Sequence, residues 1–96
     1  MSAPMKTYLL DCEGVSDERG FWKVYLDSTH PEGASIFGRN RAAFRDAILG
    51  GGPGWPGESE IVIISSWELR MIDGGGFHRF LEGLASESSA VRIRFE

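Results

Sequence analysis

The run EIVIISSW at positions 60–67 constrains the fold of this chain more than any other segment. Its residues 61–64 are all isoleucine or valine, which are β-branched and apolar. A short continuous run of this kind predicts a strand of a parallel sheet that is buried on both faces. We therefore expect this strand to lie at the centre of a sheet.

Two further segments have the pattern of strands. TYLLDC at 7–12 is a short apolar run that stops at Glu13-Gly14. VRIRFE at 91–96 alternates apolar residues with Arg92 and Arg94, which predicts a strand with one face in water. The chain therefore has three predicted strands.

Segments with helical spacing separate these strands. The first follows Ser16, which offers an N-cap, and extends to about Ser28; the second runs from about Arg39 to Leu49; the third covers 77–86. Strands separated by helices imply parallel pairing through right-handed crossovers. The predicted fold class is α/β, a three-stranded parallel sheet with three to four helices in a single domain over residues 1–96.

Composition limits the function classes. A net charge of -4 argues against direct nucleic-acid binding, because phosphate neutralisation needs a basic face, and a cationic partner is more natural. The apolar runs are too short for a membrane span, and the N-terminus lacks the apolar core of a secretory signal. The single cysteine, Cys12, cannot form an internal disulfide. We expect a cytoplasmic protein that does not engage a membrane.

The sequence offers little for catalysis. His30 and His78 fall in no metal or triad pattern, and the acids Asp11 and Glu13 at a strand end lack supporting residues. The loop GGGPGWPG at 50–57 lacks the lysine and serine or threonine of a phosphate-binding loop. We expect no enzymatic activity, no cofactor and no metal, and a small enzyme remains the less favoured alternative.

Asp46 is the most informative single residue. The predicted core face of the second helix is Ala43, Phe44, Ala47 and Ile48. Asp46 lies about 200° around the helix from Phe44, so it faces water. Its helical neighbours three and four positions away are apolar or glycine and cannot pair with it. It is either a solvated surface aspartate or a charge held for a cation on a partner.

Apolar residues flank this helix in both loops. Trp55 lies between Gly54 and Pro56, where it either packs over the helix as a plug or anchors a partner. Ile36 and Phe37 precede the helix in a second loop. Together these elements predict one protein-binding patch with an acid at its centre, made of Ile36, Phe37, Arg39, Ala42, Asp46 and Trp55.

The segment IFGRNRAAFRDAILGGGPGW, residues 36–55, resembles the barstar family of intracellular ribonuclease inhibitors. The order of the strand ending in Trp67, the next helix and the last strand is similar too. The resemblance implies that Ile36 and Phe37 take the family's aromatic-pair positions and that Gly38 and Asn40 match. It also implies that Asp46 occupies the position of the family's principal inhibitory acid, and that Trp55 occupies the position of the tryptophan after the helix.

Three departures from the family accompany these matches. Ala42 replaces an earlier acid on the exposed helix face, and Arg45 replaces a tryptophan beside the principal acid. Where the family contributes a glutamate, this chain has DGGGF, with only Asp73 nearby; Glu68 is the other possible second acid. These changes imply a partner different from barnase. The roles of Arg39, Arg41 and Arg45 stay open.

The resemblance implies a monomeric immunity-type protein of bacterial origin. Its partner would be a small secreted, guanyl-preferring ribonuclease, bound one to one, with Asp46 in place of the RNA phosphate. The alternative is a barstar-fold module that binds a different toxin or a regulatory protein.

Overall fold

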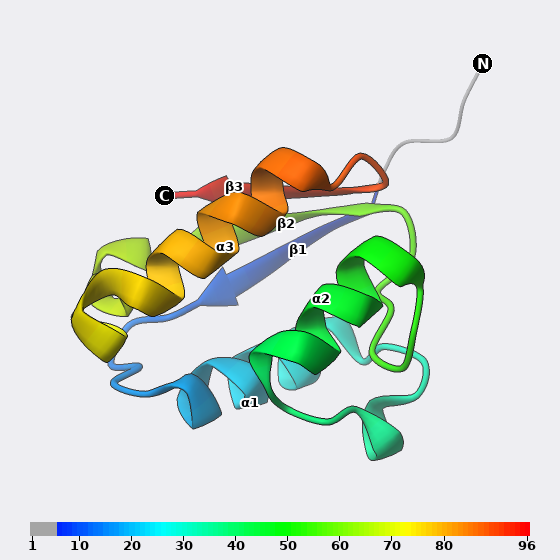
Figure 1. The fold of residues 1–96 in the computed structure, drawn as a ribbon, viewed down its shortest axis with the longest axis horizontal. Coiled ribbons are helices and arrows are strands. Elements are labelled where there is room, and N and C mark those ends of the chain that lie inside the picture. Colours follow the sequence, from blue (N-terminus) through cyan, green and yellow to red (C-terminus); the bar gives the residue numbers. More distant parts are fainter. Residues whose placement is uncertain (1–5) are drawn as a thin grey trace.

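A computed structural model describes residues 6–96 (Figure 1). Its sheet contains β1 (Lys6–Asp11), β2 (Ser59–Ile64) and β3 (Val91–Phe95), paired in parallel in the order β1-β2-β3. The predicted α/β class is confirmed, and so is the central place of the strand that contains IVII. Because all three strands run the same way, each connection between them crosses over through helices.

The connections contain three α-helices and two 3-10 segments. These are α1 (Glu18–Thr29), η1 (Ala34–Ile36), α2 (Arg41–Gly50), η2 (Ser66–Gly75) and α3 (Gly76–Glu87). Figure 1 shows α3 running in front of β2 and β3, with α2 beside α1. The predicted number of helices is therefore confirmed.

Side-chain caps set the first residues of α1 and α2. The N-cap of α1 is Asp17 and not Ser16, because the Asp17 carboxylate accepts a hydrogen bond from the Gly20 N–H at 2.8 Å. The Asn40 side chain accepts from the Ala43 N–H at 2.8 Å and caps α2. Helix α2 consequently begins two residues later than predicted. Arg39 is not helical but left-handed, with φ 53°.

The strand predicted to continue to Trp67 ends earlier, at Ile64. Ser65 adopts a left-handed conformation with φ 59°, and Ser66 donates from both its N–H and its hydroxyl to the Glu96 carbonyl at 3.0 Å. These bonds turn the chain into η2. As a result Trp67 lies outside the sheet and is 63% exposed.

The core lies between the sheet and the helices. Ile61 and Ile63 of β2 lie in this core, and Val62 on the opposite face of the strand is buried too. The strand is therefore buried as predicted. The sheet is not covered on the Val62 face, however, because the paired residues Leu9 and Arg94 are exposed. In β3, Arg92 and Arg94 are exposed while Val91 is buried, which confirms one wet face.

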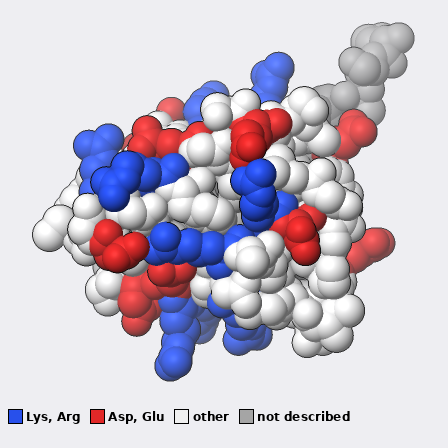
Figure 2. All heavy atoms as spheres, in the orientation of Figure 1, with Lys and Arg blue, Asp and Glu red and all other residues white. Residues whose placement is uncertain are grey.

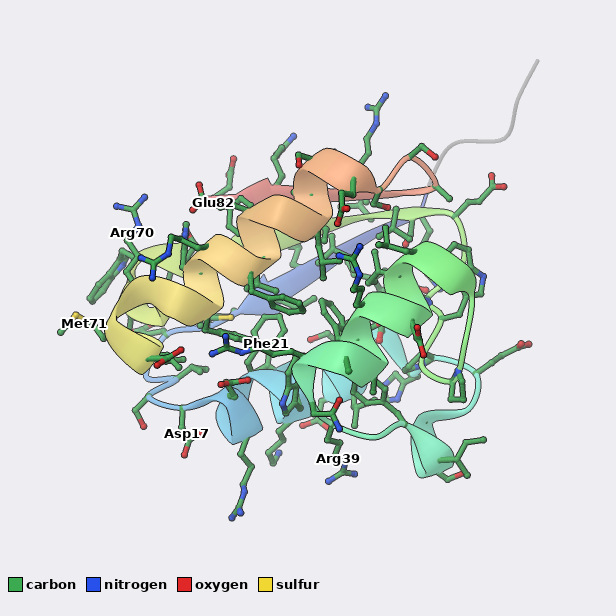
Figure 3. All side chains as sticks on the ribbon, in the orientation of Figure 1. Asp17, Phe21, Arg39, Arg70, Met71 and Glu82 are labelled. Carbon is green, nitrogen blue, oxygen red and sulfur yellow. The ribbon has the colours of Figure 1, made fainter. Side chains whose placement is uncertain are left out.

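Aromatic packing fixes α2 on α1. The Phe44 ring lies 5.9 Å from Phe21, 5.2 Å from Trp22 and 5.0 Å from Tyr25, measured between centroids. The labelled ring of Phe21 points into the middle of the molecule in Figure 3. The predicted core face of α2 is confirmed, because Phe44, Ala47 and Ile48 are buried and Ala43 packs against the core. The outer face of α2 is therefore held on a rigid base.

Over residues 6–96, every helix is too short or too polar to cross a membrane.

Candidate functional site: the outer face of α2

Asp46 lies on the outer face of α2 and is exposed. Within residues 6–96 its carboxylate forms no ion pair and no hydrogen bond. Its backbone carbonyl accepts from the N–H groups of Gly51 and Gly52, which close the end of the helix. The side chain is thus a solvated charge on well-fixed backbone, as the helical pattern predicted.

Arg45, the neighbour of Asp46, forms an ion pair with an acid from another helix. Its guanidinium donates to both carboxylate oxygens of Glu87 in α3, at 2.6 and 3.2 Å. These hydrogen bonds raise the pKa of Arg45 and lower the pKa of Glu87. Arg45 is therefore an internally paired cation.

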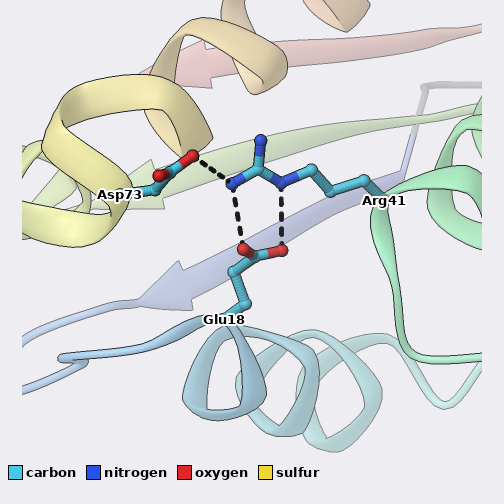
Figure 4. A network of polar contacts seen from close by, with 3 residues as sticks. All are labelled: Glu18, Arg41 and Asp73. Carbon is cyan, nitrogen blue, oxygen red and sulfur yellow. Dashed lines mark hydrogen bonds and ion pairs between the residues drawn. The ribbon is translucent and has the colours of Figure 1, made fainter.

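Arg41 is paired in the same manner at the start of α2 (Figure 4). Its Nε and Nη2 donate to the two Glu18 oxygens at 3.1 and 2.9 Å, and Nη2 also donates to Asp73 at 3.1 Å. The guanidinium lies 5.5 Å from the Phe77 ring centroid and 5.9 Å from that of Phe80. The hydrogen bonds to Glu18 are the main cause of the raised pKa of Arg41.

The two candidate second acids both have structural partners. Asp73 is exposed but bound to Arg41, so it belongs to the network that joins α1, α2 and η2. Glu68 accepts a short hydrogen bond from the Gly14 N–H and thereby fastens the loop after β1 to η2. Sequence alone gave no sign of these partners, because both lie far from the acids along the chain.

The apolar pair before α2 divides between surface and core. Ile36 is 72% exposed, but Phe37 is only 5% exposed, with its ring 5.9 Å from Trp22 and 6.1 Å from Tyr25. The predicted patch therefore loses Phe37 from its surface. The reason is that the edge of the aromatic cluster on α1 needs an apolar cover, and the Phe37 ring supplies it.

The remaining residues at the start of α2 are exposed. Gly38, Arg39, Asn40 and Ala42 all reach the surface, although the Asn40 side chain also caps the helix. Figure 3 shows Arg39 pointing away from the body of the molecule. Among the described residues, Arg39 has no ion-pair partner, unlike Arg41 and Arg45.

Trp55 is half-buried and packs against the core. It borders a shallow surface hollow with Leu49 and Gly51 at the end of α2. The plug interpretation thus describes part of the ring, while the rest stays accessible beside α2.

Tyr25, which the sequence did not single out, helps to hold the loops on both sides of α2. The Tyr25 hydroxyl donates to the Gly54 carbonyl at 2.6 Å, and the Gly54 N–H donates to the Glu32 carbonyl at 2.9 Å. The loop before α2 and the loop after it are therefore joined to each other and to α1. Tyr25 was recognisable only as part of an apolar helix face, since its hydroxyl partner lies 29 positions away.

Charges of both signs cover this side of the molecule. Figure 2 shows basic and acidic side chains interleaved over the face that carries α2 and α3. The ion pairs of Arg41 and Arg45 are part of this mixture. Among the described residues, Asp46 is thus an acid without an ion pair beside charges of both signs, and it is not part of a large acidic field.

An open groove lies between α1 and the start of α2. Its lining includes Trp22 and charged side chains of both signs, namely Asp17, Glu18, Lys23, Asp27 and Arg39. The two buried groups whose pKa values are most raised, Cys12 and Tyr25, lie in the core and do not line it. Within residues 6–96, no group of three or more His, Cys, Asp and Glu side chains is placed to hold a metal ion.

Comparison with known proteins adds no relative: no protein-family model matches this chain, and no curated protein matches it.

Proposed function

We propose that this protein inhibits a small secreted ribonuclease by placing the outer face of α2 over the enzyme's active site. The observation that carries the proposal is the state of Asp46. It is an exposed carboxylate without an ion-pair partner in the described chain, on a helix whose inner face is locked into an aromatic core. The likeness of residues 36–55 to the barstar family supports a ribonuclease as the target.

The chemistry of the target explains the inhibition. A ribonuclease active site gathers cationic and hydrogen-bonding groups that bind phosphate. A rigidly presented carboxylate takes the phosphate's place there without offering a bond to cleave. Ile36 and the accessible part of Trp55 supply apolar contact around Asp46, while buried Phe37 supports the loop from below. The protein would act in the cytoplasm as a monomer, one to one, and not as an enzyme.

The test is a titration of the wild-type protein and Asp46→Ala into a panel of small guanyl-preferring ribonucleases, with RNA cleavage as readout. We expect near-stoichiometric inhibition by the wild type and a loss on the order of a hundredfold in affinity for Asp46→Ala. Glu13→Ala is the matched control, because it removes one exposed acid from the loop after β1. Equal inhibition by Asp46→Ala and Glu13→Ala would count against the proposal.

A second candidate, a binding module for a different toxin or regulatory protein, is favoured by one observation. Ala42 and the paired arginines leave Asp46 as the one acid on α2, where the family resemblance implies more. A folded wild-type protein that inhibits none of the ribonucleases would select this second candidate.

A further inference from the structure

Arg45 and Asp46 are adjacent on α2, and their charges act on each other. The charge of Asp46 contributes to the raised pKa of Arg45, after the larger effect of Glu87. Yet the Arg45 guanidinium is bound to Glu87 through two hydrogen bonds and forms no ion pair with Asp46. The cation nearest to Asp46 in sequence is thus drawn toward α3.

A released Arg45 would have a different position available. Side chains at adjacent helix positions point about 100° apart, so they do not pair in a fixed geometry. An arginine side chain is nevertheless long and flexible, and one without a partner can lean over its neighbour and screen that charge. The Asp46 carboxylate would then be partly neutralised before any partner arrived.

We propose that Glu87 is a positioning residue for the binding face: by holding Arg45 in a bidentate pair, it keeps Asp46 unscreened for a cationic partner. The inference rests on the proposed function, because it assumes that Asp46 meets cations of an active site. Glu87 is the last residue of α3 and thus belongs to a different helix from Asp46, which lies on α2.

The other arginine of α2 is also held in ion pairs with acids from other elements. Arg41 is bound by Glu18 and Asp73, which come from α1 and η2. Both arginines on the helix that carries Asp46 are therefore neutralised by acids from outside it. For Arg41 and Arg45 the structure thus shows partners within the chain, while the effect of Arg45 on a bound partner is what the experiment below measures.

The experiment compares Glu87→Gln with Glu82→Gln in ribonuclease inhibition. Both variants remove one exposed negative charge from α3, but Glu82 contacts His78 and not Arg45. We expect Glu87→Gln to weaken inhibition about threefold to tenfold and Glu82→Gln to remain near wild type. The double variant Arg45→Gln/Glu87→Gln removes the released cation and should recover wild-type inhibition. Equal inhibition by the two single variants, or no recovery in the double variant, would overturn the inference.

A second measurement separates this inference from the proposed function. Retention on a heparin column reports an accessible cation without any ribonuclease, and a released Arg45 stays accessible because it forms no fixed pair with the adjacent Asp46. We expect Glu87→Gln to elute at higher salt than Glu82→Gln, and Arg45→Gln/Glu87→Gln to lose this difference. If the wild type inhibits no ribonuclease, the proposed function fails, whereas equal elution of the two single variants shows that Glu87 does not mask Arg45.

Discussion

The Phe37 ring lies directly against the backbone of Gly54, so close that a Cβ at position 54 would sit 2.8 Å from the Phe37 Cδ1. The contact joins the loop before α2 to the loop after it. Gly54 also has a φ of 97°, in the region that side chains with a Cβ rarely adopt. The loops before and after α2 therefore both depend on the absence of a side chain at position 54.

Gly54→Ala should be strongly destabilising. The new methyl group meets a packed aromatic ring in addition to the cost of the positive φ, so we expect a loss of about 2–4 kcal/mol in the free energy of unfolding. Gly57→Ala is the matched control, because Gly57 has φ 79° but no described atom outside its own neighbours lies within 4 Å of the Cβ that an alanine would add. That control should lose only about 1 kcal/mol. Urea denaturation of both variants measures the difference, and similar losses would show that the Phe37 contact is unimportant.

Arg41→Met should loosen the joint between α1, α2 and η2. The substitution leaves Glu18 and Asp73 without their cation and removes the cation–π contacts with the Phe77 and Phe80 rings. Since the network is partly exposed, we expect a loss of about 1–2 kcal/mol in unfolding free energy at low salt, and a smaller loss in 1 M NaCl.

Arg19→Met serves as the comparison for Arg41→Met. Arg19 is exposed on α1 and has no ion pair within residues 6–96. This variant should change the unfolding midpoint little. A loss in Arg19→Met as large as that in Arg41→Met would mean that general charge, and not the network, is responsible.

The Cys12 thiol should be inert in the folded protein. Burial, with smaller contributions from Asp11 and Glu68, raises the pKa of Cys12 from 9.0 to about 12. A thiol reagent at about pH 8 should therefore modify Cys12 only after a denaturant is added, because the thiolate is the reactive form. Rapid modification of the native protein would contradict the burial of this side chain.

The same shift gives a pH dependence of stability. Between pH 9.0 and about 12 the folded protein keeps the Cys12 proton that the unfolded chain releases. This contribution is complete below pH 9 and falls as the pH rises toward 12. Cys12→Ala should show a shallower alkaline loss of stability than wild type in urea titrations at increasing pH.

The local pattern of the sequence determined the elements and the direction of their side chains. The β-branched run at 61–64 was sufficient to predict a central buried strand, because its hydrophobicity leaves no polar face. Helical periodicity was sufficient to place Asp46 on the outer face of α2, because two positions at about 100° each put it about 200° around the helix from Phe44. The ends of elements were less well predicted, since the Asn40 cap and the Ser66 turn depend on particular hydrogen bonds.

Only the tertiary structure decided which charges remain unpaired. Arg41 and Glu18 are 23 positions apart, and Arg45 and Glu87 are 42 positions apart, so no periodicity within one element links them. The burial of Phe37 beside exposed Ile36 depended likewise on an aromatic cluster built from α1 and α2. Periodicity records the direction in which a side chain leaves its own helix or strand, whereas its partner is set by how separate elements pack.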